Sequence, residues 1–370
     1  MQTLEFPTVD RFGPEQVLFV ADPSAGLQAV VVVDNVAAGP AIGGVRIAPD
    51  ITVDEVARLA RAMTFKNAAA GLPHGGAKSG IVADPGMPRP EKIRLVRAFG
   101  TAIRDVTAYV PGPDMGLDEE MMAHLRAVTG RAVGLPAVLG GIPLDVLGAT
   151  GFGVAVAADV AAEMGLVDLA GARVVVQGFG SVGAHAARFL VARGARVVAV
   201  SDSRGAVAHA EGLDVDKLTA HKRAGEPVGT FPGGSPLEPD ELVGLDCEIW
   251  VPAARPDVFT AENADAVRAR LVLQGANIPA TLEAEAMLHA RGVVCVPDFI
   301  ANAGGVICAA VEYAGGGRAQ AFAAIEERIR TNTRVVLERS AQEGSTPRAA
   351  AEALAAERVE EAMRYRHVPA

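Results

Sequence analysis

The feature that most constrains this 370-residue chain is a glycine-rich turn between a strand-like and a helix-like segment. Residues 173–177 have the apolar pattern of a buried strand, and residues 182–192 have that of a helix. The turn consists of Gly178, Phe179, Gly180, Ser181, Val182 and Gly183. A second strand is predicted over 196–200, and Asp202 follows it, 19 residues past Gly183. A lone G-x-G-x-x-G is a weak signal, but this whole context predicts dinucleotide binding rather than an ordinary tight turn.

The physical basis of this pattern is backbone access. Glycines let the chain approach a pyrophosphate closely, and the N-terminus of the following helix stabilises its charge. Asp202 is placed to bind the adenosine ribose hydroxyls, which favours NAD. Ser201, Ser203 and Arg204 could instead hold a 2′-phosphate, so NADP stays open.

Three more short buried strands are predicted over 248–251, 271–274 and 293–296. Strands that alternate with helices predict an α/β fold with a parallel sheet, here a Rossmann dinucleotide-binding domain. The chain exceeds the ~250–300 residues at which a single core stops growing, so a second domain is expected. The first 145 residues also mix both element types, with a strand over 28–33 and a helix over 52–70 opened by a Thr52–Glu55 capping box. The stretch GGIPLDVLGATGFG, residues 140–153, predicts a hinge between the domains.

Composition excludes several classes of protein. The net charge is −10 and no Lys/Arg run suggests a nucleic-acid partner. No apolar run reaches the ~18–20 residues that span a membrane, and MQTLEFPTVD lacks a signal-peptide pattern. Cys247, Cys295 and Cys308 form no C-x-x-C pair, which predicts buried thiols in a reducing compartment. We expect a cytoplasmic protein without a metal, since no histidine shows ligand spacing.

Two lysines are candidates for chemistry. Lys66 ends the predicted helix at the edge of its apolar stripe. A functional role and a purely structural one, with the stem on apolar surface and the ammonium group in water, fit this position equally well. Lys78 lies in the glycine-rich segment 75–80, where the alternatives are a surface turn and a phosphate loop; the phosphate-loop pattern fails because Ala77 displaces the lysine. Two amines near one pocket would lower one pKa toward neutrality and make that amine a usable base.

Three further polar residues follow turn-like or strand-like segments. Asp114 lies in VPGPDMG, where an Asx turn or helix cap is the alternative to a functional role. Asn277 and Asn302 follow strand-like segments of the nucleotide-binding region, and parallel sheets bind ligands at their strand carboxyl ends. Turn chemistry alone is again plausible for each asparagine.

Seven ordered segments carry a family resemblance: GPAIGG, MTFKNAAAGLPHGGAKSGI, PGPDMG, ATGFGV, VVVQGFGSVG, QGANIP and PDFIANAGGV. Together they resemble the glutamate/leucine/phenylalanine/valine dehydrogenase family, from about Glu15 to about Arg364. The resemblance implies an N-terminal α/β domain for substrate and oligomerisation, residues 1–145 with 331–370, because the family's C-terminal helices return to the first domain. It implies a Rossmann domain over 146–330 and a homo-oligomer.

The resemblance also implies roles for single residues. Lys66 matches the lysine that binds the substrate α-carboxylate, Lys78 the catalytic lysine, and Asp114 the aspartate that moves protons to and from the substrate nitrogen. Thr150 and Asn277 match positions lining the nicotinamide, and Asn302 a position facing the active cleft. The implied reaction oxidises an amino acid to an iminium, which a water activated by neutral Lys78 converts to a 2-oxo acid and ammonia.

The substrate side chain is expected to be hydrophobic, as for leucine, valine or phenylalanine. Glutamate-specific members resemble this chain around Gly43 and Gly44, but they carry a lysine at the position of Ile42 and a serine at that of Ala309. Both carboxylate ligands are missing here. Segments of the second half resemble the glutamate branch more closely, so glutamate dehydrogenase is the alternative. A non-catalytic nucleotide-binding regulator is a third hypothesis, against which the retained lysines and aspartate speak.

Overall fold

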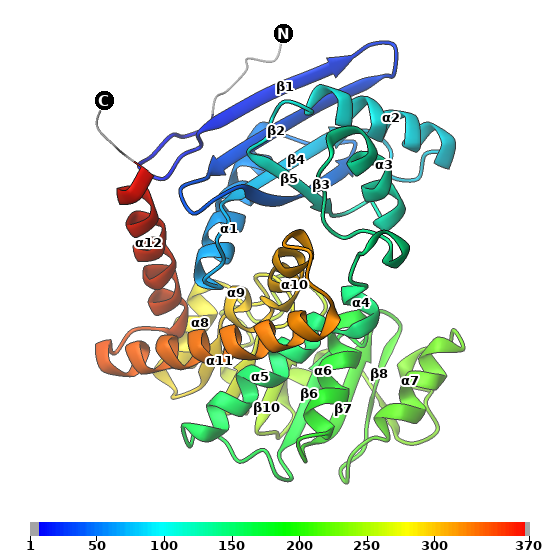
Figure 1. The fold of residues 1–370 in the computed structure, drawn as a ribbon. Coiled ribbons are helices and arrows are strands. Elements are labelled where there is room, and N and C mark those ends of the chain that lie inside the picture. The colour runs from blue at the N-terminus through cyan, green and yellow to red at the C-terminus, as the bar shows by residue number, and fades with distance from the viewer. Residues whose placement is uncertain (1–6, 367–370) are drawn as a thin grey trace. The chain divides into compact units, whose positions relative to one another are not determined.

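The computed structural model describes residues 7–366 and contains two compact units (Figure 1). The first unit comprises Met1–Pro143, Val306–Ala324 and Glu352–Ala370; the second comprises Leu144–Gly305 and Ile325–Ala351. The first border falls inside the stretch expected to be a hinge. The chain after residue 305 divides differently from the expected border at 331, because residues 306–324 pack into the first unit and residues 325–351 into the second. Residues 1–6 of the segment compared with a signal peptide lie outside the described residues.

The first unit is built on a five-stranded mixed sheet in the order β1-β2-β4-β3-β5. Its strands are β1 (Gln16–Asp22), β2 (Leu27–Asn35), β3 (Ala41–Ala48), β4 (Gly76–Val82) and β5 (Tyr109–Pro113). β2 pairs antiparallel with β1 and β4, whereas β3 pairs parallel with β4 and β5. The strand expected over 28–33 is confirmed within β2.

Both faces of this sheet are covered, which explains why residues 29–33 of β2 form a continuous apolar run rather than an alternating one. Val31 and Val33 face a core made with α2 (Arg89–Ala102) and α3 (Glu119–Thr129). Val30 and Val32 face α1 (Val53–Ala69). Since paired residues share a face, β4 presents Ala77 to the α2/α3 core and Lys78 to the α1 side.

The helix expected over 52–70 is confirmed, but its capping box is only half formed. The Thr52 side chain accepts a hydrogen bond from the Glu55 backbone N–H at 3.2 Å. The Glu55 carboxylate does not return to the cap; it accepts a hydrogen bond from Arg46 instead. A charged partner on the neighbouring strand outweighs a neutral backbone N–H, so tertiary structure redirects this side chain.

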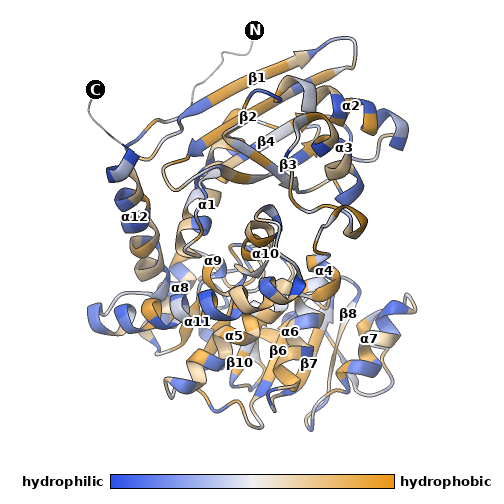
Figure 2. Cartoon of the chain, viewed as in Figure 1, coloured by the Kyte–Doolittle hydropathy of each residue, from blue (hydrophilic) through white to orange (hydrophobic). Residues whose placement is uncertain are grey.

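The second unit contains a seven-stranded sheet in the order β12-β11-β10-β6-β7-β8-β9. Its strands are β6 (Arg173–Gln177), β7 (Arg196–Asp202), β8 (Gly205–Ala208), β9 (Ser235–Leu237), β10 (Ile249–Pro252), β11 (Leu271–Leu273) and β12 (Val294–Val296). The five strands from β12 to β7 are parallel, as expected for a Rossmann domain, and Figure 2 shows the hydrophobic colouring of β6 and β7. The antiparallel edge formed by β8 and β9 was not predicted.

Part of the expected hinge is helical. Residues 149–153 form the first turns of α5 (Ala149–Glu163). The glycines in these turns allow neighbouring helices to pack closely against α5. A Cβ on Gly151 would lie 2.6 Å from the backbone nitrogen of Ala186, in α6 (Ser181–Val191). A Cβ on Gly153 would lie 2.5 Å from Ile329, in α11 (Arg318–Glu343). The other helices are α4 (Leu144–Leu147), α7 (Val215–Arg223), α8 (Leu282–Ala290), α9 (Asp298–Ala301), α10 (Gly304–Tyr313) and α12 (Pro347–Arg366).

The three cysteines are free and buried, as the sequence predicted. Within residues 7–366, no helix is long and apolar enough to cross a membrane. Over the same residues, His, Cys, Asp and Glu side chains form no group of three or more that could hold a metal ion.

We expect Arg61→Met to destabilise the protein by about 2–4 kcal/mol, because it strands a buried charge. Asp34 is 1% exposed and accepts hydrogen bonds from Arg61 Nε at 2.9 Å and from Thr64 Oγ1 at 2.6 Å. Arg58→Met on the same helix is the control, since Arg58 and its partner Asp54 are 72% and 74% exposed. Urea unfolding of both variants measures the difference, and equal midpoints would contradict the prediction.

Candidate active site and nucleotide-binding site

A buried lysine and a half-buried aspartate form an ion pair across the middle strand of three in the first unit. Lys78 lies on β4 and Asp114 directly follows β5, while β3 runs between them. Val45 of β3 pairs with the residue after Lys78 and with the residue before Asp114, so both side chains reach across Gly44. Lys78 Nζ lies 2.8 Å from Asp114 Oδ2, with the lysine side chain 8% exposed. The segment for which a surface turn was an alternative is therefore a buried central strand.

Two adjacent glycines make this arrangement possible for different reasons. A Cβ on Gly44 would lie 2.8 Å from Asp114 Cβ and 3.1 Å from Lys78 Nζ, so the missing side chain leaves room for the pair. A Cβ on Gly43 would lie 1.6 Å from the carbonyl oxygen of Ala77, so this glycine permits the close approach of β3 to β4. Gly44 therefore leaves space for the charged pair, and Gly43 allows the two strands to pack closely.

Arg46 adds a third charge to the pair. Its Nε donates to the same Asp114 oxygen, Oδ2, at 3.0 Å, and its guanidinium also binds Glu55. Burial raises the pKa of Asp114, but Lys78 and Arg46 outweigh burial and hold that pKa below its ordinary value. Asp114 is therefore a carboxylate at neutral pH. Sequence reasoning missed Arg46, although its position two residues after Gly44 places it on the same face of β3.

On the opposite face, Tyr109 ties the three strands together beneath the pair. Its hydroxyl donates to the carbonyl oxygen of Gly43 at 3.1 Å and lies 2.8 Å from Ser79 Oγ. Burial raises the pKa of Tyr109, which keeps the hydroxyl protonated and able to donate. Sequence reasoning missed this support because Tyr109 and its two partners come from three separate segments.

An apolar cluster lies on the same sheet face as the pair. Ile42 is two residues from Gly44 on β3, about 7 Å away along the strand. Ile42 packs with Val110 and Val133, and Ala309 of α10 packs against them. The two positions that set apart glutamate-specific members, Ile42 and Ala309, thus share one apolar wall although 267 residues separate them.

Glu312 fixes α10, the helix that contributes Ala309 to this wall. Its two carboxylate oxygens accept the backbone N–H groups of Leu135 and Ile142 at 3.0 and 2.8 Å. Glu312 is 8% exposed and lies one turn beyond Ala309 on α10. A buried charge satisfied by two amides holds α10 against the loop that follows α3, and therefore holds Ala309 in place.

Lys66 is half-buried in the last turn of α1, the helix that covers the Lys78 face of the sheet. The next residue, Asn67, is buried and donates to the carbonyl oxygen of Gly75 at 2.7 Å. Asn67 Oδ1 is a buried acceptor without a partner among residues 7–366. The end of α1 thus brings a cation and an available acceptor to the face on which Lys78 lies.

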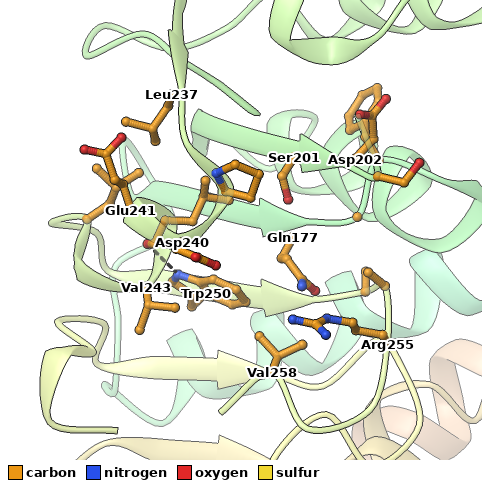
Figure 3. A pocket seen from close by; sticks show the side chains of 18 of the residues that line it. Gln177, Ser201, Asp202, Leu237, Asp240, Glu241, Val243, Trp250, Arg255 and Val258 are labelled. Carbon is orange, nitrogen blue, oxygen red and sulfur yellow. Dashed lines mark hydrogen bonds between the residues drawn. The ribbon is translucent and has the colours of Figure 1, made fainter. Parts of the chain in front are cut away.

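The second unit contains a cavity of about 1260 Å³ at the carboxyl ends of β6 and β7. The glycine-rich turn, Asp202, Ser203 and Lys222 line it, and Figure 3 shows Asp202 and Ser201 on one side and Val243 and Trp250 on the other. A buried acceptor, Gln177 Oε1, belongs to the lining residue that ends β6 and has no partner among the described residues.

The geometry of the turn fits a bound pyrophosphate. Gly178 has φ +94°, and a Cβ there would lie 2.6 Å from Ala254. A Cβ on Gly183 would lie 1.9 Å from the carbonyl oxygen of Gly178, so the helix packs tightly on the turn. Gly180 faces open space, and the first turn of α6 carries backbone N–H groups that no helix bond uses. The residues present therefore fit a dinucleotide.

Asp202 has partners that the sequence did not predict. Lys222 of α7 forms an ion pair with its carboxylate, and the backbone N–H groups of Arg204 and Val228 donate to it. Burial raises the pKa of Asp202, but these partners outweigh burial and hold it below its ordinary value. No local motif marks Lys222, since only the folded chain brings α7 beside the end of β7.

The structure brings the two predicted asparagines together. Asn277 follows β11 and Asn302 follows α9, and Asn302 Nδ2 donates to Asn277 Oδ1 at 3.0 Å. Thr150 lies against the start of α10, because a Cβ on Gly305 would be 3.4 Å from its Oγ1. Within each unit, candidate site residues that are distant in sequence therefore lie close together.

Comparison with known proteins decides the family. The model of the glutamate/leucine/phenylalanine/valine dehydrogenase family matches residues 140–367, and that of the Glu/Leu/Phe/Val dehydrogenase dimerisation domain matches residues 14–130. The chain belongs to this family. It is an amino-acid dehydrogenase, an oxidoreductase acting on CH–NH₂ groups.

The relatives of this dehydrogenase include three glutamate dehydrogenases. That of Aeropyrum pernix is 39% identical over 90% of this chain and 85% of its own length. That of Thermotoga maritima is 41% identical over 75% of this chain and 70% of its own. An NADP-specific glutamate dehydrogenase of Saccharolobus shibatae is 38% identical over 76% of this chain and 69% of its own.

Two solved structures share the fold of the dehydrogenase. The hetero-hexameric glutamate dehydrogenase of Thermus thermophilus, in a leucine-bound form, aligns with a TM-score of 0.84 at 34% identity, covering 96% of this chain and 91% of the other. The L-tryptophan dehydrogenase of Nostoc punctiforme aligns with a TM-score of 0.75 at 27% identity, covering 94% and 96%.

Proposed function

We propose that this dehydrogenase converts an L-amino acid and water, with oxidised NAD or NADP, reversibly to a 2-oxo acid and ammonia, with the reduced cofactor and a proton. The observation that carries this proposal is the Lys78–Asp114 pair, with 2.8 Å between Nζ and Oδ2, beside an apolar wall. A proton can move between an amine and a carboxylate at that distance, and deamination needs protons delivered to and removed from one nitrogen.

Each charged group of the first unit then has one task. Lys66 would bind the substrate α-carboxylate through its ammonium group. Lys78, after passing its proton on, would activate the water that attacks the substrate carbon. Asp114 would carry protons to and from the nitrogen, while Arg46 holds its carboxylate in place. When bound to the second unit, NAD(P) supplies the hydride acceptor, and the protein supplies binding and proton transfer.

We expect Lys78→Arg to lower kcat by about 10²–10⁴-fold, the usual contribution of general acid–base catalysis. Arginine keeps the positive charge beside Asp114 but cannot give up its proton. Lys78→Ala should lose at least as much activity, and both variants should keep the dinucleotide affinity of the wild type. Steady-state kinetics and dinucleotide titration measure the two effects. Near-normal kcat for Lys78→Arg would remove Lys78 from the role of base.

For the substrate we propose L-glutamate, in preference to the hydrophobic amino acid expected from Ile42 and Ala309. Three relatives of 38–41% identity are named glutamate dehydrogenases, and they outweigh an argument from two side chains. Because Ile42 and Ala309 offer no charge, the distal carboxylate of glutamate would have to find its partners at other residues.

A hydrophobic amino acid is the second candidate, and the apolar wall favours it. Ile42, Val110 and Val133 pack together on the sheet face of the pair, and partly buried Ala309 packs against them, so the nearest side chains offered there are apolar. A methylene buried there gains about 0.8 kcal/mol. A buried, unpaired carboxylate costs several kcal/mol. A solved structure of this fold is an L-tryptophan dehydrogenase, so an apolar side chain is compatible with the fold.

Relative kcat/KM on 2-oxoglutarate and 4-methyl-2-oxopentanoate at one ammonia concentration separates the two substrates. We expect 2-oxoglutarate to be preferred, and the reverse preference would assign the apolar substrate. Ile42→Lys with Ala309→Ser should raise the ratio in favour of 2-oxoglutarate, since it adds a cation and a hydroxyl for the distal carboxylate. Ile42→Met with Ala309→Ser is the matched control that changes shape without adding the cation.

We propose that the chain binds NAD and also accepts NADP. Asp202 suits ribose hydroxyls, which favours NAD. Lys222 neutralises part of that negative charge in the same cavity and could itself contact a 2′-phosphate. A relative is named NADP-specific, which agrees with this wider choice.

We expect Lys222→Ala to lower kcat/KM for NADP far more than for NAD, because it leaves Asp202 unpaired against the 2′-phosphate. Lys217→Ala is the control on the same helix, since Lys217 is 78% exposed and pairs with Asp214. The ratio of the two kcat/KM values is the measurement. An equal ratio in both variants would show that Lys222 does not select the cofactor.

We also propose a homo-oligomer in the cytoplasm. The dimerisation-domain model matches residues 14–130, which supports assembly of like subunits. The Thermus thermophilus relative is described as hetero-hexameric, so a chain of this fold assembles with others there. β1 is an edge strand whose Phe19 side chain is 52% exposed, which suits burial against another subunit.

A further inference from the structure

A buried arginine from the C-terminal part of the second unit reaches the strand-end loops of the Rossmann sheet. Arg348 lies in the first turn of α12, and its side chain is 8% exposed. Its guanidinium donates to Glu285 at 2.8 and 2.9 Å, to Gln274 at 2.8 Å and to Asp298 at 3.0 Å. One side chain therefore bonds three acceptors from three separate segments.

These acceptors also bond one another. Gln274 directly follows β11, and Asp298 begins α9 after β12. Gln274 Nε2 donates to Glu285 at 2.6 Å, and Gln274 Oε1 accepts the backbone N–H of Asp298 at 3.1 Å. Arg348 is the cation of this network and faces two carboxylates, so its removal would leave two buried negative charges together.

Asp298 also contacts a residue with a strained backbone. Its other oxygen, Oδ2, accepts the backbone N–H of Ile278 at 2.9 Å. Ile278 has φ +42°, a conformation that β-branched residues rarely adopt. Its side chain is 56% exposed, so packing of that side chain does not account for the conformation.

The strained residue is next to Asn277, and the second asparagine is joined to the same network. Asn302 Nδ2 donates to Asn277 Oδ1 at 3.0 Å, and the Asn302 backbone N–H donates to the Asp298 carbonyl oxygen at 2.7 Å. Arg348 is thus one hydrogen bond from Asp298, and Asp298 is in direct contact with both asparagine-bearing loops.

We infer that Arg348 is a positioning residue that holds Asn277 and Asn302 in place for the nicotinamide end of the cofactor. The inference rests on the proposed function, in which Asn277 would line the nicotinamide and Asn302 would face the active cleft, as the family resemblance implies. As a positioning residue, Arg348 would touch neither substrate nor cofactor. It acts by keeping Asp298 turned toward the Ile278 amide, and a misplacement of about 1 Å in such a loop can cost about 10²-fold in rate.

The test uses Arg348→Lys, because one amine keeps the charge but cannot bond three acceptors in the planar geometry of a guanidinium. We expect kcat to fall by about 10–100-fold. We also expect affinity for NAD(P)H to fall while affinity for ADP-ribose, which lacks the nicotinamide, stays at the wild-type value. Titration of the full-length protein with both ligands measures this split, which a general loss of structure would not produce.

Arg193→Lys is the matched control in the same unit. Arg193 Nε donates to both oxygens of Asp159 at 2.8 Å, and this ion pair is far along the chain from the asparagine loops. It should leave kcat and both affinities unchanged. If Arg348→Lys does not fold, Asp298→Asn tests the same link, since it removes the charge that holds Arg348 and keeps the size of the side chain.

Two results would overturn the inference: an equal loss of affinity for NAD(P)H and ADP-ribose, or a kcat equal to that of the wild type. Asn277→Ala and Asn302→Ala separate this failure from failure of the proposed function. If these two variants do not change NAD(P)H affinity relative to ADP-ribose, the assignment of the asparagines is wrong. If they do and Arg348→Lys does not, only the role of Arg348 is wrong.

Discussion

The close approach of β3 to β4 is the constraint on which the candidate catalytic site depends. At Gly43 the two backbones are so near that a Cβ would lie 1.6 Å from a carbonyl oxygen. This contact, supported from below by the Tyr109 hydroxyl, sets the spacing at which Lys78 and Asp114 meet across Gly44. The charged pair is thus a product of backbone packing, and the low exposure of Lys78 follows from its place on a central strand.

The second unit uses the same device at another site. Gly178 and Gly183 let the turn and helix α6 pack closely, and Gly180 leaves open space beside the helix N-terminus. In both units glycine serves to remove a side chain where backbone, ligand or catalytic group must come near. Strand register then places Lys78 beside Asp114. In the second unit the buried Arg348–Asp298 ion pair fixes the start of α9.

The substrate is the point at which two kinds of argument disagree. Relatives point to glutamate, whereas the wall formed by Ile42, Val110, Val133 and Ala309 has no charge for a second carboxylate. The disagreement is informative, because a glutamate enzyme with this wall must bind the distal carboxylate by residues other than Ile42 and Ala309. Glu312 does not supply that charge, because its carboxylate oxygens already accept the backbone N–H groups of Leu135 and Ile142.

The sequence by itself determined the α/β class, the glycine-rich turn with Asp202, and the helix over 52–70, because these depend on local periodicity and on spacing within one supersecondary unit. It also singled out Lys78 and Asp114, but it left a surface turn and a helix cap open for them. Only the tertiary structure decided that they meet, that Glu55 turns to Arg46, and that Lys222 and Arg348 reach Asp202 and Asp298. Those partners come from separate segments, and long-range pairing leaves no periodic trace in the chain.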